Sequence, residues 1–335
     1  MLPGIVQKIN LISKNLKYQK IFYKQIACYS ISKTQNLGII GVPFYKGQPK
    51  SGVDLAPKFL RDYGLIEKLK NIGNKKIIDY GDLTYNLENV KTLENALNYQ
   101  DVISVNKALS LKIQEILKEN DQFLVLGGDH SIGFGSIAGH LAFDPNISVI
   151  WIDAHADLNT YLSSNSGNIH GMPLSMVIDE LKDYYIKTDV SKIVKNYLPA
   201  KNLYYIGLRD LDSFEKSFIR EKGIMAFGMM DIEKLGIPTI MDFIIKSIGS
   251  NNKIHISFDV DSLDPSISPS TGTSVFGGLN LREIFYILEK LNDTGNVTGF
   301  DVVEINPLLG DERDANLTVN TAIEAIKIIM GYKRF

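Results

Sequence analysis

The sequence predicts a three-layer α/β/α fold built on a mostly parallel central sheet. Short apolar runs alternate along the chain with longer segments of helical periodicity, and no linker divides residues 37–335. The runs are apolar at both alternating positions, which is typical of parallel strands covered by helices on both faces. Regular alternation of strand and helix is the pattern of α/β layer architecture. Residues 37–335 are therefore expected to form one domain.

Six buried strands are expected, at residues 37–42, 123–128, 147–152, 203–208, 254–258 and 297–303. Helices are expected at residues 55–70, 95–119, 281–291 and 318–330. Asp54 is the predicted N-cap of the first helix. Asn280 and Glu283 have the spacing of a capping box at the third, and Gly331 suits the C′ position after the last.

Composition excludes several classes of protein. Hydrophobic residues make up 44% and charged residues 22% of the 335 residues, as in ordinary globular proteins. No uninterrupted apolar stretch is long enough to predict a membrane span. The net charge of −2 gives no reason to propose nucleic acid as a partner. Cys28 is the only cysteine, which excludes an internal disulfide and a cysteine zinc cluster.

Residues 1–36 differ from the rest of the chain. They contain no acidic residue and six lysines: Lys8, Lys14, Lys17, Lys20, Lys24 and Lys33. Apolar residues from Ile5 to Leu16 follow a helical spacing. A basic, acid-free, amphipathic leader resembles a mitochondrial transit peptide, although such peptides favour arginine. An N-terminal extension of a cytoplasmic protein is the equal alternative.

Acidic and histidine side chains follow five of the predicted strands. They are Asp129 and His130; Asp153, His155 and Asp157; Asp210 and Asp212; Asp259 and Asp261; and Glu304. Ligands of open parallel sheets bind beyond the carboxyl ends of the strands, so we expect these side chains to meet. Packed together without a cation, so many carboxylates would repel one another.

Spacing favours a metal site at this edge. Asp153, His155 and Asp157 lie at every second position, which places them on one face of an extended segment, and Asp259 and Asp261 repeat the pattern. With His130 they form a set of four carboxylates and two imidazoles, which suits a hard, high-coordinate ion better than tetrahedral zinc. Two ions can share such a set and hold a hydroxide between them, and Mn²⁺ is the expected metal.

The two remaining histidines outside the site segments belong to no cluster. His140 is expected on a helix surface or in solvent, and His255 is expected as a hydrogen-bonded packing residue within a strand. Each motif taken alone could also have a purely structural role, as a turn or a helix cap. The metal prediction depends on the occurrence of all of them at strand ends in one chain.

These residues resemble the signature blocks of the ureohydrolase family. The blocks are GGDHS at 127–131, WIDAHAD at 151–157 and SFDVDSLDP at 257–265, and the resemblance extends from about residue 38 to about residue 331. The segment 159–171 (NTYLSSNSGNIHG) resembles the arginase branch of that family. The resemblance implies an arginase/deacetylase-like fold and a homotrimer or hexamer. It also implies hydrolysis of L-arginine to L-ornithine and urea with two Mn²⁺ per subunit.

The resemblance also implies roles for individual residues. One Mn²⁺ would be held by His130, Asp153, Asp157 and Asp259, and the other by Asp153, His155, Asp259 and Asp261. His170 would shuttle protons, Asp157 would relay one, and Glu304 would anchor the guanidinium. The substrate-binding residues would be Asn159, Ser166 and Asn168 for the α-carboxylate, Asp212 and Glu215 for the α-amino group, and Thr273. Ser262 stands where the family usually has glycine, and Ser270 and Ser274 also depart from its pattern.

Other functions remain open on the sequence. An agmatinase or another guanidino-hydrolase would have the same metal core, but agmatine has no carboxylate for the neutral donors of the 159–170 loop to bind. That loop is also compatible with Ser and Asn side chains that satisfy their own backbone. A catalytically silent relative would have lost a ligand, His170 or Glu304. A metal-dependent deacetylase would lack the doubled acidic ligand sets.

Overall fold

The computed structural model describes residues 35–73 and 75–334. Within this part of the chain, eight strands form one sheet in the order β2-β1-β3-β8-β7-β4-β5-β6. Their bounds are β1 Gln35–Gly41, β2 Lys75–Asp82, β3 Gln122–Leu126, β4 Ile147–Ile152, β5 Leu203–Leu208, β6 Met225–Gly228, β7 Lys253–Asp259 and β8 Val297–Val303. Asn36–Phe335 form one compact unit. The predicted leader lies, apart from residues 35 and 36, outside the described residues.

The central strands are parallel and nearly in step. The pairs β1–β3, β3–β8, β8–β7, β7–β4, β4–β5 and β5–β6 are all parallel. Phe258 of β7 pairs with Ile152 of β4 on one side and with Val302 of β8 on the other. The predicted parallel sheet is confirmed, and its central strands end within about a residue of one another.

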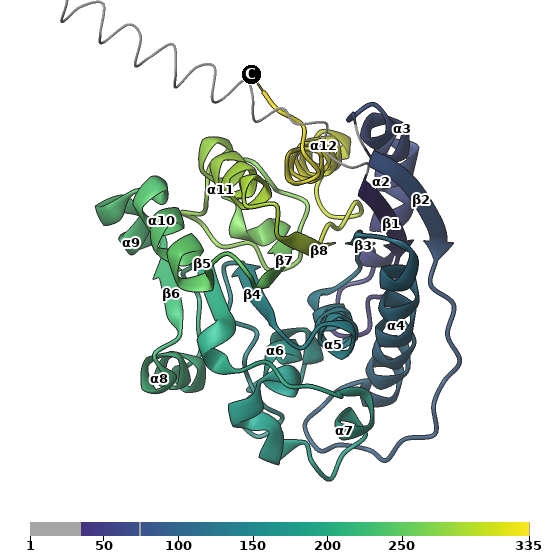
Figure 1. The fold of residues 1–335 in the computed structure, drawn as a ribbon. Helices are drawn as coiled ribbons and strands as arrows, with labels where there is room; N and C mark the ends of the chain where they lie inside the picture. The colour runs from purple at the N-terminus through teal and green to yellow at the C-terminus, as the bar shows by residue number, and fades with distance from the viewer. Residues whose placement is uncertain (1–34, 74, 335) are drawn as a thin grey trace, which may run out of the picture. The chain divides into compact units, whose positions relative to one another are not determined.

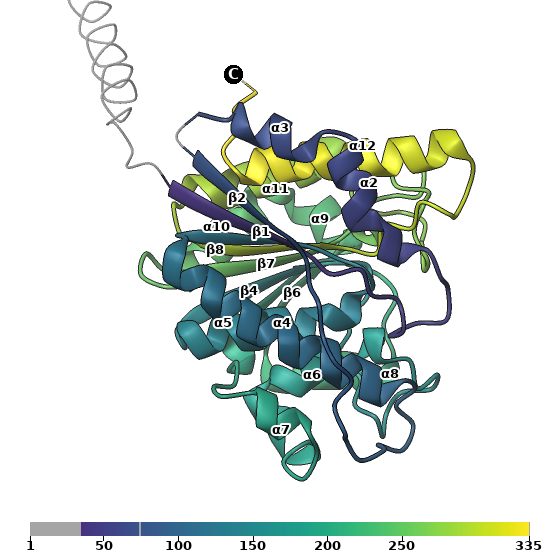
Figure 2. The ribbon, with the colours of Figure 1, turned by 90° about the vertical axis from the view of Figure 1, so that its right-hand side faces the viewer.

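Helices cover both faces of the sheet, which confirms the three layers (Figures 1 and 2). One layer contains α4 Tyr99–Glu119, α5 Gly133–Phe143, α6 Pro173–Val177, α7 Val190–Ile193 and α8 Ser213–Lys222. The other contains α2 Ala56–Asp62, α3 Leu65–Lys70, α9 Met229–Leu235, α10 Ile237–Ile248, α11 Leu281–Asp293 and α12 Glu312–Ile329. The six predicted strands are largely buried on both sides, as their mostly apolar sequences predict, whereas the edge strands β2 and β6 are partly exposed.

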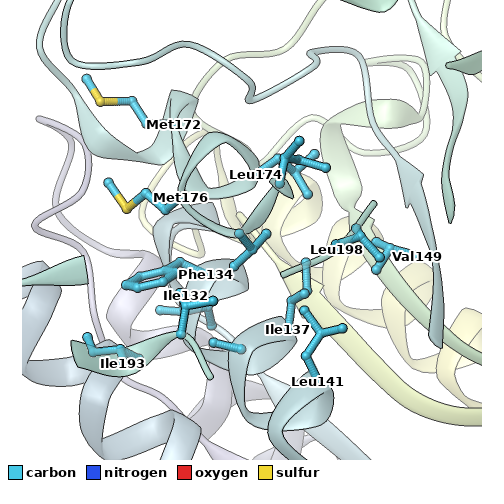
Figure 3. Close-up of a cluster of buried hydrophobic side chains, with 14 of the residues drawn as sticks. Ile132, Phe134, Ile137, Leu141, Val149, Met172, Leu174, Met176, Ile193 and Leu198 are labelled. Carbon is cyan, nitrogen blue, oxygen red and sulfur yellow. The ribbon is translucent and has the colours of Figure 1, made fainter. Parts of the chain in front are cut away.

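Two apolar cores fill the space between the layers. Figure 3 shows part of the first, where Ile137 and Leu141 of α5 lie toward Val149 of β4 and Leu198, and Phe134 of α5 lies further from them. All five side chains are fully buried. This core supports the carboxyl end of β4, from which three predicted metal ligands project.

The structure corrects two of the predicted helices. Residues 55–70 form α2 and α3, because Gly64 between them adopts a left-handed backbone with φ of 81°. Asp54 is not the N-cap: it lies in a short 3₁₀ turn, where its carboxylate accepts a hydrogen bond from the Gly52 N–H. The helix expected from residue 95 begins at Tyr99.

The two C-terminal helices agree better with the capping residues predicted from the sequence. The capping box of Asn280 and Glu283 at α11 is confirmed. The last helix begins earlier than expected, at Glu312, because Asp311 and Asp314 form a second capping box there. Gly331 follows it with a left-handed φ of 105°, as expected for C′.

The prediction for His140 is wrong. Its side chain is buried, with Nδ1 3.1 Å from Nδ1 of His255 and Nε2 3.0 Å from the Thr298 hydroxyl. Burial lowers the pKa of His140 well below its ordinary value. His255 is confirmed as a hydrogen-bonded strand residue, since its Nε2 lies 2.9 Å from the Asp301 carboxylate. α5 is buried from Gly133 to Leu141, so the side of the helix that carries His140 is also internal.

Candidate metal centre and active site

Polar side chains meet where five neighbouring strands end. In the sheet β3, β8, β7, β4 and β5 are consecutive neighbours, although they lie far apart in the sequence. Their carboxyl ends carry Asp129 and His130, Glu304, Asp259 and Asp261, Asp153 to Asp157, and Asp210 and Asp212. The residues that sequence analysis grouped by strand ends therefore lie at one edge, as expected for parallel strands.

Three of these aspartates form the same local turn. Asp129, Asp153 and Asp259 each accept a hydrogen bond from the backbone N–H two residues further on, at 3.0, 2.7 and 2.8 Å. Such Asx turns end a strand and fix the carboxylate at the turn. One carboxylate oxygen is used locally, and in Asp153 and Asp259 the other lies 3.1 Å from Nδ1 of His130.

The paired glycines before Asp129 allow a close approach of two chain segments. A Cβ at Gly128 would lie 1.8 Å from the carbonyl oxygen of Phe44, so only glycine fits. The N–H of Asp129 donates to that same carbonyl at 2.9 Å. Asp129 also accepts from the Gly47 N–H, and Gly47 in turn accepts from the N–H of His170. The segment 42–50 thus joins the end of β3 to the loop that carries His170.

His130 lies at the centre of the first candidate metal group. Its Nε2 lies 2.9 Å from the Ser257 hydroxyl, and its ring stacks on Trp151 with centroids 3.9 Å apart. Its Nδ1 is 3.1 Å from one carboxylate oxygen each of Asp153, Asp157 and Asp259. This buried Nδ1 has no properly aligned hydrogen-bond partner. A nitrogen lone pair faced by three carboxylates is the environment that a divalent cation satisfies.

His155 forms the second candidate group with Asp153 and Asp261. Its Nδ1 lies 3.1 Å from Asp261 and 3.4 Å from Asp153. Ligand atoms of His130, Asp153 and Asp157 fall within 4.8 Å of one another, as do those of Asp153, His155 and Asp261. Asp153 belongs to both groups, so two neighbouring metal positions would share its carboxylate.

The electrostatics of the cluster favour the binding of a cation. Burial, together with the Asp153 carboxylate, raises the pKa of Asp157 and also raises that of Asp261 to about 6. Burial and the Asp261 carboxylate hold the pKa of Asp259 well above its ordinary range. Burial lowers the pKa of His130, but its interactions with the three carboxylates outweigh this effect and raise it well above its ordinary value. A bound cation would stabilise the ionised carboxylates and the neutral imidazoles.

Glu304 and His170 lie beside the first group. One oxygen of Glu304 accepts from the His130 N–H at 2.8 Å and lies 3.3 Å from Nδ1 of His170. Burial lowers the pKa of His170, but the Glu304 carboxylate outweighs it and raises the pKa to about 9. Glu304 and Asp157 have left-handed backbones, with φ of 63° and 49°. Such conformations cost roughly 1–3 kcal/mol and concentrate at functional sites.

A cavity of about 240 Å³ opens next to these groups. It is lined by three members of the metal cluster and by the polar 159–171 loop. The lining residues are His155, Asp157, Asn159, Ser164, Asn165, Ser166, Asn168, His170, Gly171, Asp210, Leu211, Asp212, Glu215, Asp259 and Thr273. Every residue expected to bind substrate therefore borders one cavity. Glu304 is buried beside it, next to His170.

Away from the candidate metal groups, at what we call the far end of the cavity, hydrogen bonds show which side chains are already engaged by the protein. Asn159 donates to the Asp212 carboxylate at 2.8 Å and accepts from the Ser163 hydroxyl. Both oxygens of Glu215 are engaged by backbone, one by the Leu158 N–H and one by the Asp212 N–H. Burial raises the pKa of Glu215 to about 7. Glu215 thus fixes the loop and the start of α8, which leaves Asp212 as the more available carboxylate.

Thr273 and Ser262 contact the metal cluster rather than the far end. The Thr273 hydroxyl donates to Asp261 at 3.0 Å. Ser262 is fully buried, its hydroxyl donates to the Asp259 carbonyl at 2.7 Å, and its backbone is not left-handed. The departure from glycine at this position is therefore accommodated without strain.

Sequence analysis missed three supporting residues. Trp151 donates to Asp153 at 2.9 Å, and Ser257 contacts His130. Arg209 donates to the backbone carbonyls of Gly207, Asp261, Ser262, Leu263 and Val275. Ser257 and Trp151 each precede a predicted ligand by two residues, so strand alternation places them on the ligand's face. This two-residue spacing could have identified Trp151 and Ser257 as supporting residues from the sequence.

The fold and the site define a class: an α/β protein with two carboxylate–histidine groups that could hold metal ions, beside a polar cavity. Comparison with known proteins gives the family. The model of the arginase family matches residues 35–331, and the chain belongs to this family.

The relatives agree over nearly the whole chain. Human arginase-1 is 42% identical over 307 residues, which cover 90% of this chain and 95% of that protein. Rat "Arginase-2, mitochondrial" is 38% identical over 320 residues, covering 94% and 90%. The crystal structure of arginase from Bacillus cereus matches with a TM-score of 0.81 and 36% identity, covering 90% of this chain and all of that one.

Proposed function

We propose that this protein is an arginase that hydrolyses L-arginine to L-ornithine and urea. The observation that carries the proposal is the single cavity with two chemically different ends. Carboxylates and imidazoles with the spacing of a metal site border one end, and neutral donors with one available carboxylate border the other. L-Arginine carries a guanidinium at one end and an amino acid group at the other, so its two ends match the two ends of the cavity.

We propose that the cluster holds two Mn²⁺. His130, Asp153, Asp157 and Asp259 would hold one, and Asp153, His155, Asp259 and Asp261 the other, so Asp153 and Asp259 would belong to both sets. The oxygen-rich donor set and the unpartnered Nδ1 of His130 support this proposal. When bound, a pair of divalent ions lowers the pKa of water and so supplies hydroxide at moderate pH.

The protein's own groups then hold the substrate and move protons. The buried Glu304 carboxylate would form a charge-assisted pair with the guanidinium and orient its carbon. The Asp157 carboxylate borders the cavity and would pass a proton to the leaving amine. His170 directs Nδ1 toward Glu304, so its Nε2 is left to exchange protons with solvent in the cavity.

The far end of the cavity would bind the amino acid group. Asn159, Ser166 and Asn168 supply neutral donors for the α-carboxylate. The Ser166 hydroxyl accepts from the Asn168 N–H, which leaves its own proton to donate. Asp212 would attract the α-ammonium group. A substrate without the carboxylate would leave these donors without a partner, which is unfavourable in a confined site.

Parallel assays with L-arginine and agmatine test this function. The purified, Mn²⁺-loaded protein is expected to release urea from L-arginine with a kcat/KM at least about 10²-fold higher than from agmatine, since unpaired polar groups penalise the shorter substrate. Release from agmatine alone would keep the metal chemistry and contradict the carboxylate-binding role of the loop. Release from neither substrate by metal-loaded protein would contradict the proposed activity.

Two predictions from the sequence remain predictions. Residues 1–36 are predicted to direct the protein to mitochondria. Their lysines and their lack of acidic residues support this prediction, and one of the relatives is named "Arginase-2, mitochondrial", from rat. A fusion of residues 1–36 to a fluorescent protein would then co-localise with a mitochondrial marker, whereas a diffuse cytoplasmic signal would contradict the prediction. The expected homotrimer or hexamer also remains a prediction. Among the described residues, no helix is long and apolar enough to cross a membrane.

A further inference from the structure

A long loop between β2 and α4, residues 83–98, ends beside the cavity loop. The loop runs from the edge of the sheet past α4 to the start of that helix (Figure 1). Its last part contains Asn95 and Asn98, both with left-handed backbones of φ 49° and 53°. The other non-glycine residues in the described chain with such a backbone are Asp157 and Glu304, both in the site. Asparagine adopts this conformation more readily than most residues, but it remains uncommon.

Asn95 contacts the cavity loop at two points. Its side-chain amide donates to the carbonyl of Tyr161 at 2.9 Å and to the carbonyl of Ser164 at 2.8 Å. The N–H of Leu97 donates to the carbonyl of Gly167 at 2.8 Å. A Cβ at Gly167 would lie 2.9 Å from the Asn95 side-chain oxygen, so the two segments are in close contact there.

These bonds hold a segment that has little regular structure of its own. Residues 158–165 contain a turn in which Ser163 and Ser164 donate to the Thr160 carbonyl, and no helix or strand. Asn159 and Ser166 flank the residues that Asn95 contacts. Because donors must be fixed in direction to select a ligand, the position of this turn controls how well the cavity receives a carboxylate.

Asn98 attaches the same loop to the segment 42–50. Its side-chain amide donates at 2.8 Å to the carbonyl of Lys46. The neighbouring Gly47 accepts from the His170 N–H. Residues 95–98 therefore contact the cavity loop and also the segment that accepts the His170 N–H, without lining the cavity themselves.

We propose that Asn95 is a positioning residue that sets the preference for substrates with an α-carboxylate, by holding the 159–168 loop through the Tyr161 and Ser164 carbonyls. This proposal rests on the proposed arginase function. The left-handed backbone directs one short amide to two carbonyls three residues apart, a task that a residue with an ordinary backbone at this point would not perform.

The test uses two variants and a matched control. N95G keeps the left-handed backbone accessible and removes both donors, and N95D keeps the size of the side chain while replacing its N–H donors with oxygen. N86G makes the same change at an exposed position of the same loop. For each Mn²⁺-loaded protein, KM and kcat for L-arginine are measured, and the affinities for L-ornithine and putrescine are measured by calorimetry. Putrescine lacks the α-carboxylate of L-ornithine.

The N95G and N95D variants are expected to show a KM for L-arginine raised about tenfold, as the loss of two hydrogen bonds implies, with kcat changed less than about twofold. The Kd for L-ornithine should rise about tenfold while that for putrescine and the metal content stay unchanged. N86G should match the wild type. Equal loss of affinity for both ligands, or loss of metal, would show that Asn95 has only a structural role and would overturn the proposal. An unchanged KM for L-arginine would also overturn it. A wild type inactive on L-arginine would instead overturn the proposed function first.

Discussion

The Asp153→Asn variant is expected to lose metal from both positions and to release urea from L-arginine about 10³-fold more slowly, or slower still. Asp153 belongs to both candidate groups, where it contacts His130 and His155. Asparagine keeps the size of the side chain and can still accept the local hydrogen bond from the His155 N–H. It removes the negative charge that two cations would share, and metal ions contribute several kcal/mol to such reactions.

Metal content by mass spectrometry and urea release are the two measurements for Asp153→Asn. Asp183→Asn provides the control, because Asp183 is exposed, does not line the cavity and belongs to neither candidate metal group. The control should keep the metal content and the rate of the wild type. If the Asp153→Asn variant retained both, the assignment of a shared ligand would be wrong.

Replacement of Glu304 with glutamine is expected to lower kcat/KM for L-arginine about 10²–10³-fold while leaving the metal content unchanged. Glu304 is buried, and the guanidinium would lose a charge-assisted partner in a site screened from water. The glutamine carbonyl can still accept from the His130 N–H, so the fold should be retained. Steady-state kinetics with metal analysis of the same samples check this expectation.

Loss of metal from the Glu304→Gln protein would point to a ligand role instead of substrate binding. A kcat/KM within about threefold of the wild type would show that the guanidinium is held elsewhere. Glu233→Gln, at an exposed position in α9, tests whether removal of any acidic charge has the same effect through the net field of the protein.

The left-handed backbones at Asp157 and Glu304 give these predictions a structural context. Both residues follow strands that end at the site, and each is one of four non-glycine residues in the described chain with such a backbone. Strain of this kind persists only where the surroundings fix the residue. Glu304 is fixed by β8 and by its bond to His130, which places its carboxylate between His130 and His170.

The central part of the fold was predictable because its local signals agree with its environment. The apolar runs of β4, β5 and β8 have the predicted bounds, since strands buried on both faces carry apolar residues at most positions of both alternations. The edge strands β2 and β6 were not predicted, because their sequences lack such an apolar run. β2 is partly exposed and contains Lys75 and Asp82, and β6 has only four residues, so neither produces an apolar run.

The error at His140 has a similar origin. A lone histidine in a helix is exposed or buried depending on what packs against it, and the sequence of α5 does not contain that information. The partners of His140 are His255 on β7 and Thr298 on β8, more than a hundred residues away. Their proximity follows from the strand order, which local sequence patterns do not determine.

The sequence by itself determined the chemical inventory of this protein: which acids and histidines follow which strands, the alternate spacing that directs them to one face, and the polar loop after them. These are local properties, fixed by backbone geometry over a few residues. The tertiary structure alone decided the order in which the strands lie side by side, the burial of His140, the commitment of Glu215 to the backbone, and the attachment of Asn95 to the cavity loop. Each of these depends on contacts between segments distant in the sequence, which form only when the whole sheet and its two helical layers have packed.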